Sequence, residues 1–199
     1  MLTLYHFPNS RSSSLVWLLE ELEVPYETKI VNIRRRDGSG ARDPANPHPH
    51  GKVPVIRHDG VNVFEIAAIT LYLTDAFPEK KLGPLVGDPR RGEYLSWLAY
   101  RPGVLEPSMM MRFLKVPHVQ GTMGWAEPGE VENVLNETLS TRKYFLGDAF
   151  SAVDVALGGA INFMMGFRLL NETPVLKEYC ERITARPAYQ RAIERDAHK

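Results

Sequence analysis

The sequence has a single cysteine, Cys180, among its 199 residues, so it cannot form a disulfide within the chain. That usage is typical of a reducing compartment. The sequence also lacks any run of about 20 apolar residues, the length that spans a bilayer, and its first residues show no signal-peptide pattern. Its 24 acidic residues balance 24 basic ones, which leaves no basic footprint for nucleic acid. These absences predict a cytoplasmic protein with no membrane and no nucleic-acid partner.

The first 77 residues alternate between strand and helix patterns. Residues 2–6 alternate as a short strand, residues 9–14 form a turn rich in helix-capping side chains, and a second strand is expected over 26–32. Between the turn and the second strand, leucines recur at the i, i+3, i+4, i+7 spacing of a helix with one buried face. This stripe consists of Leu15, Leu18, Leu19 and Leu22. The order predicts a βαβ unit.

A second β-rich motif lies at residues 51–69. Pro54 has no N–H to give to a sheet, so it is expected at the first position of a strand or at an edge. The backbone of Val53 is then free to pair with another molecule. Asp59 and the glycine after it form a two-residue hairpin signal between two β runs, and Glu65 opens a helical pattern. The βαβ and ββα units together predict a thioredoxin-like α/β domain.

After residue 77 the apolar spacing is helical throughout. We expect a domain of residues 1–78, a linker over 79–87, and an all-helical domain of residues 88–199. Pro102 and the glycine after it are expected to bend or break the first long helix of this second domain. Further helices are expected over 131–144, 153–170 and 174–185, and from residue 188.

Three stretches carry a resemblance to a known family: LYHFPNSRSSSLVWLLEELEVPYE near the start, NPHPHGKVPV with VFEIAAITLYL in the middle, and YFLGDAFSAVDVAL near the end. The last contains Ser151 and Asp154 in a Ser-x-x-Asp capping box, in which each side chain can satisfy the other residue's N–H. Across nearly the whole chain, the sequence resembles the cytosolic glutathione transferases with a serine-type active site. The resemblance implies a thioredoxin-like domain followed by an all-α domain, glutathione as cosubstrate, and a homodimer.

The chemistry implied by this resemblance is activation of a thiol, because only the thiolate is a competent nucleophile. The thiol pKa of about 8.5 has to fall by about one to two units, which a hydroxyl donor and a helix N-terminus can supply together. Ser10 is expected at the position of the thiolate-binding hydroxyl, with Ser12 as the alternative. Both serines could instead only cap the helix. Tyr5 is expected to pack within its strand, and Cys180 to be a buried core thiol.

The residues that bind the cosubstrate also follow from the resemblance. Val53, placed by Pro54, is expected to offer its main chain to the cysteinyl part of glutathione as an added strand. Lys52 and His50 are expected near the glycyl carboxylate. Glu65 is expected to pair with the γ-glutamyl ammonium, although an acid at this point can also serve only the helix dipole.

Ile66 keeps alternative functions open. The family usually has Ser or Thr at this position, and the missing hydroxyl could weaken binding by about 1 kcal/mol, a typical net hydrogen bond. We expect a transferase that conjugates the glutathione thiolate to hydrophobic electrophiles. The alternatives are a glutathione-dependent isomerase or reductase, or a non-catalytic binding protein on the same fold.

The second substrate is expected against an apolar surface of the helical domain. Met109, Met110, Met111 and Phe113 could line a flexible pocket there, although a methionine run is also ordinary core filling. No metal is expected, because the histidines have no carboxylate or cysteine partners in a ligand pattern. These histidines are His6, His48, His50 and His58.

Overall fold

A computed structural model describes residues 1–197 of the chain. It contains two compact units. One is formed by Met1–Lys80 together with the chain from Arg186 onward, and the other by Lys81–Ala185. Across the described residues, no helix is both long and apolar enough to cross a membrane.

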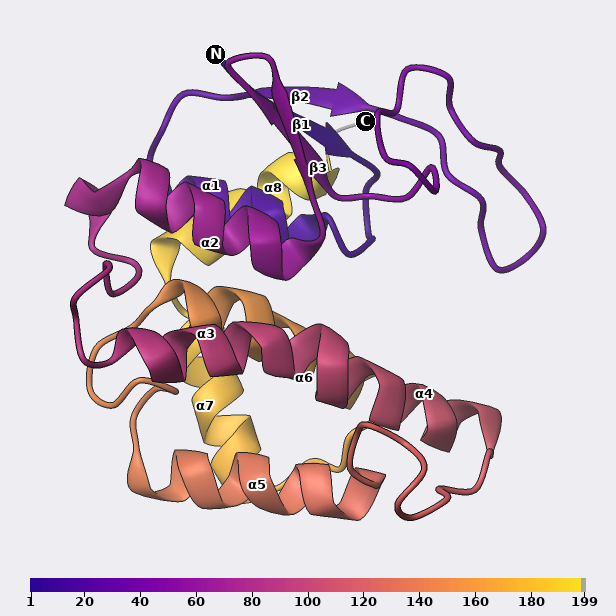
Figure 1. Ribbon diagram of the computed structural model, residues 1–199, viewed down its shortest axis with the longest axis vertical. Helices are drawn as coiled ribbons and strands as arrows, with labels where there is room; N and C mark the ends of the chain where they lie inside the picture. The colour runs from indigo at the N-terminus through magenta and orange to yellow at the C-terminus, as the bar shows by residue number, and fades with distance from the viewer. Residues whose placement is uncertain (198–199) are drawn as a thin grey trace. The chain divides into compact units, whose positions relative to one another are not determined.

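The first unit is built on a four-stranded sheet (Figure 1). Strands β1 (Leu2–His6), β2 (Glu27–Ile30), β3 (Val55–His58) and β4 (Val61–Phe64) lie in the order β2-β1-β3-β4. β1 runs parallel to β2 and antiparallel to β3, and β3 and β4 form the predicted hairpin. This mixed sheet, covered by helices, confirms the predicted thioredoxin-like domain.

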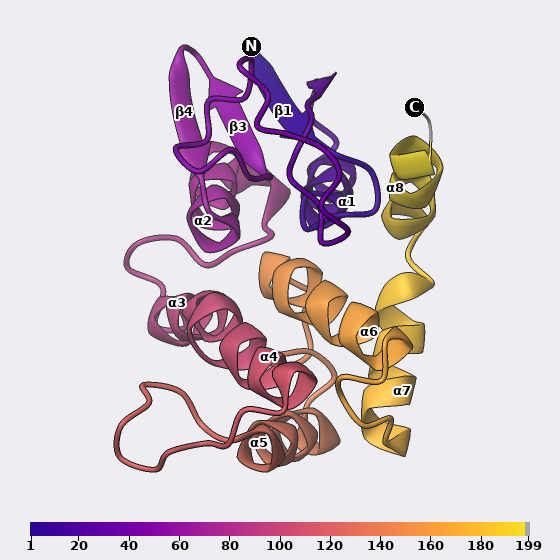
Figure 2. The ribbon, with the colours of Figure 1, turned by 90° about the vertical axis from the view of Figure 1, so that its right-hand side faces the viewer.

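Two helices cover one face of the sheet, α1 (Ser13–Leu22) and α2 (Ile66–Ala76) (Figure 2). The predicted leucine stripe of α1 lies in the core, and none of its four leucines is more than 1% exposed. A short 3-10 turn, η1 (Pro78–Lys80), follows α2. The hydrophobic spacing of the sequence therefore fixes which face of α1 meets the sheet, and with it the direction in which the β1–α1 turn points.

The last helix, α8 (Pro187–Ala197), packs against α1 within the first unit (Figure 2). Its Ala188 and Ala192 are buried, and side chains this small let the two helices approach closely. Tyr189 packs edge-on against Trp17, with ring centroids 4.9 Å apart. The sequence analysis assigned this stretch to the helical domain, whereas its partners in the structure lie on the first helix of the chain.

The second unit starts with a long helix that is widened in its middle. Helix α3 (Arg91–Tyr100) continues through a π-helical turn, η2 (Arg101–Leu105), into α4 (Glu106–Leu114). Of the two predicted effects of Pro102, a bend or a break, the break is wrong, because the chain stays helical from Arg91 to Leu114. The π turn carries the chain past the missing N–H of Pro102, because the N–H of Glu106 reaches back to the carbonyl of Arg101.

The remaining helices of the second unit are α5 (Pro128–Thr141), α6 (Gly159–Gly166) and α7 (Pro174–Thr184). Each matches an expected helix, although the one predicted over 153–170 begins with a π turn, η3 (Asp154–Gly158), and ends at Gly166. Arg101 is buried and links the two π turns, because its Nη1 donates to the carbonyl oxygen of Ala156 at 2.7 Å. The unit is all helical, as predicted.

Asp154 is fully buried at the start of η3 and is the polar centre of the second unit. Its Oδ2 accepts from the N–H and the hydroxyl of Ser151 at 2.9 and 3.0 Å. Its Oδ1 accepts from the N–H of Phe145 at 3.1 Å and the hydroxyl of Tyr179 at 2.9 Å. Only half of the predicted capping box forms, because the N–H of Asp154 bonds to the carbonyl of Ser151 and not to its hydroxyl.

Candidate functional site

The turn from β1 to α1 and the segment before β3 lie on one side of the first unit. A small apolar cluster connects them: Val53 and Val55 pack with Tyr5, and Phe7 of the turn packs against the same cluster. Tyr5 is 7% exposed, so it packs in the core as predicted. The cluster therefore holds the serine turn beside Val53, the residue expected to offer its main chain to a ligand.

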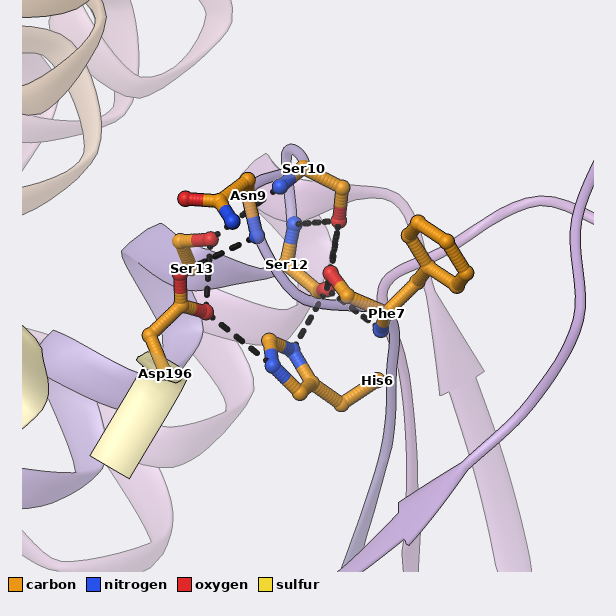
Figure 3. Close-up of polar contacts among 7 residues, drawn as sticks. All are labelled: His6, Phe7, Asn9, Ser10, Ser12, Ser13 and Asp196. Carbon is orange, nitrogen blue, oxygen red and sulfur yellow. Dashed lines mark hydrogen bonds and ion pairs between the residues drawn. The ribbon is translucent and has the colours of Figure 1, made fainter. Parts of the chain in front are cut away.

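The Ser10 hydroxyl is half-buried in this turn and contacts two oxygens (Figure 3). It donates to the carbonyl oxygen of Phe7 at 2.6 Å and lies 2.8 Å from the hydroxyl of Ser12. It also accepts from the N–H of Ser12 at 3.2 Å. Ser10 lies just before α1, where the first N–H groups of the helix have no intrahelical acceptor and favour negative charge.

The Ser12 hydroxyl has a different environment, because the residue is fully buried. It lies 2.7 Å from Nδ1 of His6 and accepts from the N–H of Phe7 at 3.2 Å (Figure 3). Although Ser12 is the residue before the first residue of α1, its side chain makes no capping hydrogen bond to the helix. Burial separates Ser12 from solvent, so Ser10 is the one of the two hydroxyls that can reach a ligand.

His6 stands behind Ser12 and contacts a carboxylate from the far end of the chain. Its Nε2 lies 3.0 Å from Oδ1 of Asp196 on α8, within ion-pair distance, and the imidazole is 2% exposed. Asp196 also accepts from the N–H of Asn9 at 3.0 Å and the hydroxyl of Ser13 at 2.8 Å (Figure 3). Burial acts to raise the pKa of Asp196, but these three partners outweigh it and hold that pKa below its usual range.

The segment before β3 has an unpaired main chain at Val53 and two exposed basic side chains. The Val53–Pro54 peptide bond is cis, and the structure gives the N–H and carbonyl of Val53 no hydrogen-bond partner among residues 1–197. Lys52 and His50 are exposed, and both lie in this segment as expected. Gly51 between them has φ of +62°, and a Cβ there would lie 2.7 Å from Cγ of Arg42, so the turn requires glycine.

Two buried residues that the sequence analysis did not single out as functional hold this segment in place. The side chain of Asn46 donates to the carbonyl of Lys52 at 3.0 Å and accepts from the N–H of His48, also at 3.0 Å. Nδ1 of His48 accepts from the N–H of His50 at 3.0 Å. Burial lowers the pKa of His48, which keeps its imidazole neutral and able to accept. Both are in the NPHPHGKVPV motif, but no periodicity marks them.

Glu65 and Ile66 stand at the start of α2. Glu65 has φ of +67°, a conformation that non-glycine residues adopt rarely and most often at ligand sites. Its side chain is 66% exposed and lies 3.7 Å from Nε2 of His48. Ile66 is 8% exposed, so its side chain belongs to the core and its backbone N–H is the group it can offer at the helix start.

Two of the three methionines of the run, Met109 and Met111, are part of the core. Met109 and Met111 are 1% and 6% exposed, and Nε1 of Trp125 donates to the sulfur of Met111 at 2.9 Å. Met110 and Phe113 are exposed. Within the described chain, no three histidine, cysteine, aspartate or glutamate side chains are grouped to hold a metal ion.

Comparisons with known proteins give one family for both units. The profile of the glutathione S-transferase N-terminal domain matches residues 1–75, and that of the glutathione S-transferase C-terminal domain matches residues 127–187. Glutathione S-transferase 3 of Schizosaccharomyces pombe is 28% identical over 98% of this chain and 88% of its own length. A disulfide-bond oxidoreductase of Escherichia coli, YfcG, is 27% identical over 97% of this chain and 94% of its own length.

A solved structure gives the same result for the fold. The crystal structure of a glutathione S-transferase from Actinobacillus pleuropneumoniae superimposes with a TM-score of 0.81 at 25% identity, covering 98% of this chain and 93% of that one. Similarity therefore extends over both units and is not confined to the sheet-containing one.

Proposed function

The chain belongs to the glutathione transferase family, and we propose that it binds glutathione, stabilises the thiolate with the Ser10 hydroxyl, and transfers it to an electrophilic carbon of a hydrophobic second substrate. The new bond joins sulfur to that carbon while a leaving group departs or a double bond is saturated. The protein's part is to keep the sulfur ionised and to hold both reactants, since the thiolate is the nucleophile.

The observation that carries this proposal is the position of the Ser10 hydroxyl. It is half-buried at the N-terminal end of α1, and its one hydrogen, which bonds to the carbonyl of Phe7, can turn to a bound thiolate, while the neighbouring Ser12 is buried in the core. A hydroxyl donating to a charged acceptor supplies about 1.5–3 kcal/mol, and a helix N-terminus about 0.3–1 kcal/mol. Since one pKa unit corresponds to about 1.36 kcal/mol, the two together can lower the thiol pKa by about one to three units, which covers the one to two units that are needed.

The opposite wall of the proposed site supplies groups for the rest of glutathione. Val53 has an unpaired main chain that can accept an added strand, and Pro54 places it. Lys52 and His50 are exposed cations or donors for the glycyl carboxylate, and Glu65 is an exposed anion for the γ-glutamyl ammonium. The N–H of Ile66 can receive the γ-glutamyl carboxylate at the start of α2.

A glutathione-dependent disulfide reductase is the second candidate. It is favoured by the 27% identity to a disulfide-bond oxidoreductase over nearly the full length of both proteins. The serine turn has no cysteine, so the thiol would have to come from glutathione itself. Turnover of a generic aryl halide supports the transferase, whereas reduction of a small disulfide without aryl-halide turnover supports the reductase.

Calorimetry of glutathione binding, combined with the ultraviolet absorbance of the bound thiolate across pH, tests the serine assignment. We expect a bound-thiol pKa about one to two units below about 8.5, returning toward the free value in Ser10→Ala. Ser12→Ala is the variant matched to Ser10→Ala, because it also removes one serine hydroxyl, two residues further along the chain. A lowered pKa that Ser10→Ala leaves unchanged contradicts the role of Ser10, and absence of binding to the native protein contradicts the enzyme itself.

We also propose that the protein is a homodimer, that it works in the cytoplasm, and that along the sequence 1–78, 79–87 and 88–199 are its glutathione-binding domain, linker and helical domain, with the last described helix, α8, packed back on α1. The resemblance to cytosolic transferases supports the homodimer and the cytoplasmic location. The single free and buried cysteine supports a reducing compartment. Light scattering coupled to size-exclusion chromatography measures the mass in solution and decides between monomer and dimer.

A further inference from the structure

Four side chains form a continuous chain of polar contacts from the half-buried turn to α8 (Figure 3). The Ser10 and Ser12 hydroxyls are 2.8 Å apart, Ser12 lies 2.7 Å from Nδ1 of His6, and Nε2 of His6 lies 3.0 Å from Asp196. Ser12 and His6 are 0% and 2% exposed. A histidine sealed between a hydroxyl and a carboxylate is a group that can hold a proton, and the simple hydroxyl-donor mechanism makes no use of it.

The contacts allow one direction of hydrogen bonding that leads from Ser10 to His6. With the hydrogen of His6 on Nε2, which faces the carboxylate of Asp196, Nδ1 is left as an acceptor for the hydroxyl of Ser12. The hydroxyl of Ser10 donates to the carbonyl of Phe7 at 2.6 Å and also lies 2.8 Å from the hydroxyl of Ser12. When its hydrogen turns from Phe7 to Ser12, both hydroxyls point toward His6, and the Ser10 oxygen is left as the acceptor at the open end.

We propose that His6 is the proton acceptor for the glutathione thiol, reached through the Ser10 and Ser12 hydroxyls, with Asp196 stabilising the imidazolium that results. The proposal rests on the proposed function and adds to it the destination of the proton. The S–H bond breaks as the proton passes to Ser10, the Ser10 hydrogen passes to Ser12, and the Ser12 hydrogen passes to Nδ1 of His6. No electrons are exchanged, and the net result is a thiolate and a protonated histidine.

After the transfer every hydrogen bond in the chain is reversed and still made. The imidazolium donates to Ser12, Ser12 donates to Ser10, and Ser10 donates to the thiolate. The positive charge on His6 therefore lies behind the hydroxyl that holds the sulfur, and a charge-assisted donor is stronger than a neutral one. His6 and Asp196 are positioning residues in this scheme, because neither touches the cosubstrate.

Few other groups around His6 can influence its charge. Asp196 of α8 is the only charged side chain in ion-pair contact with it within residues 1–197. The turn and α1 contribute the neutral Ser12 and Ser13, and Val31, just after β2, contributes its main-chain N–H, which donates to the carbonyl of His6 at 2.9 Å. A proton gained at His6 is therefore balanced by one carboxylate, supplied by a helix that is distant in sequence.

The test is the number of protons released to solvent for each thiolate formed. Calorimetry in buffers of different ionisation enthalpy at about pH 7 counts the protons, and ultraviolet absorbance counts the thiolate in the same samples. S-methylglutathione, which has no thiol proton, gives the baseline for every other group that responds to binding. If His6 keeps the proton, the native protein releases close to none per thiolate, whereas a serine that only donates to the sulfur releases about one.

Three variants distinguish a His6 that accepts the proton from a His6 that only holds the serine turn and α8 together. His6→Asn keeps an amide beside Ser12 but cannot gain a proton, so release is expected to rise to about one per thiolate, with a higher thiol pKa. Asp196→Asn keeps the size of the side chain and removes the charge, and is expected to move both values in the same direction. Arg186→Ala is the control. Arg186 directly precedes α8 and pairs with Glu21 of α1 at 2.6 Å, away from these four side chains, so its removal should leave both values unchanged.

The outcomes are distinguishable from those that test the transferase itself. Release of about one proton by the native protein overturns the role of His6 and leaves glutathione activation by Ser10 intact. An equal effect of Arg186→Ala and His6→Asn also overturns it, because loosening α8 would then be sufficient. Failure of the native protein to bind glutathione overturns both proposals. Proton release by the native protein is measured without any variant. It therefore decides the role of His6 even if His6→Asn does not fold.

Discussion

At the scale of single residues, burial assigns different roles to side chains of the same type. Ser10 and Ser12 are two positions apart, yet one is half-buried beside the open end of the turn and the other is sealed against His6. Cys180 is sealed in the same way within α7, on the predicted face shared with Leu176, Tyr179 and Ile183. Reactivity therefore follows environment and not residue type.

The thiol of Cys180 is expected to be unreactive in the native protein. Burial raises its pKa to about 12, so at pH 8 about one molecule in 10,000 carries the thiolate, against about one in ten for a thiol of pKa 9.0. Because the pKa is raised, its rate of alkylation should rise about tenfold per pH unit until near pH 12, whereas that of a free thiol levels off above about pH 9. Mass spectrometry after timed iodoacetamide treatment measures this, with the urea-unfolded chain as control. Rapid native alkylation at pH 8 would contradict it.

At the scale of secondary-structure elements, two helices of the second unit contain π turns that carry buried polar contacts. η2 provides Arg101, whose guanidinium bonds to a carbonyl of η3, and η3 begins at Asp154, which accepts four hydrogen bonds. Burial raises the pKa of Asp154, and the four donors act against that rise. The packing of α7 against η3 also depends on Gly158, where a Cβ would lie 2.4 Å from the hydroxyl of Tyr179.

Replacing Asp154 by asparagine is expected to destabilise the second unit by about 2–6 kcal/mol. An amide nitrogen cannot accept, so two of the four buried donors lose their acceptor, at about 1–3 kcal/mol each. Urea unfolding followed by circular dichroism measures the loss. Tyr179→Phe, which removes one donor and leaves the carboxylate in place, serves as the smaller matched change. A loss in Asp154→Asn no larger than that in Tyr179→Phe would show that the backbone donors contribute little.

At the scale of the whole molecule, the last described helix completes the first unit of the fold. α8 covers Trp17 of α1, and Arg191 pairs with the buried Glu20 at 3.0 Å. It also carries Asp196 to the serine turn. The residues proposed to contact glutathione all lie within the first 66 positions. The candidate site nevertheless depends on the chain beyond residue 185, which supplies Asp196.

Ending the chain at Ala185 is expected to loosen α1 and to raise the pKa of bound glutathione thiol. Exposing one large apolar side chain costs about 1.5–3 kcal/mol, and Trp17 loses its cover along with the pairs to Glu20 and Glu21. Hydrogen exchange measured by mass spectrometry should show faster exchange in α1, with α5 and α7 unchanged as internal controls. Unchanged protection of α1 would mean that α8 is dispensable for the first unit.

The sequence by itself determined the elements and the local turns of this protein. Strands, the leucine face of α1, the hairpin before α2 and the proline beside Val53 are all set by spacing and backbone chemistry within a few residues. The same local pattern places Ser10 and Ser12 before a helix, whereas their proposed role follows from the resemblance to the serine-type transferases. Such features rest on local preferences, which a linear pattern records directly.

Only the tertiary structure decided which of these residues meet. The contact between His6 and Asp196 joins residues 190 positions apart, and no periodicity or motif connects them. The same holds for α8 on α1, and for the π turn that lets α3 continue past Pro102. Burial, pairing of charges and the path of a helix are properties of packing between distant segments, so they exist only once the chain has folded.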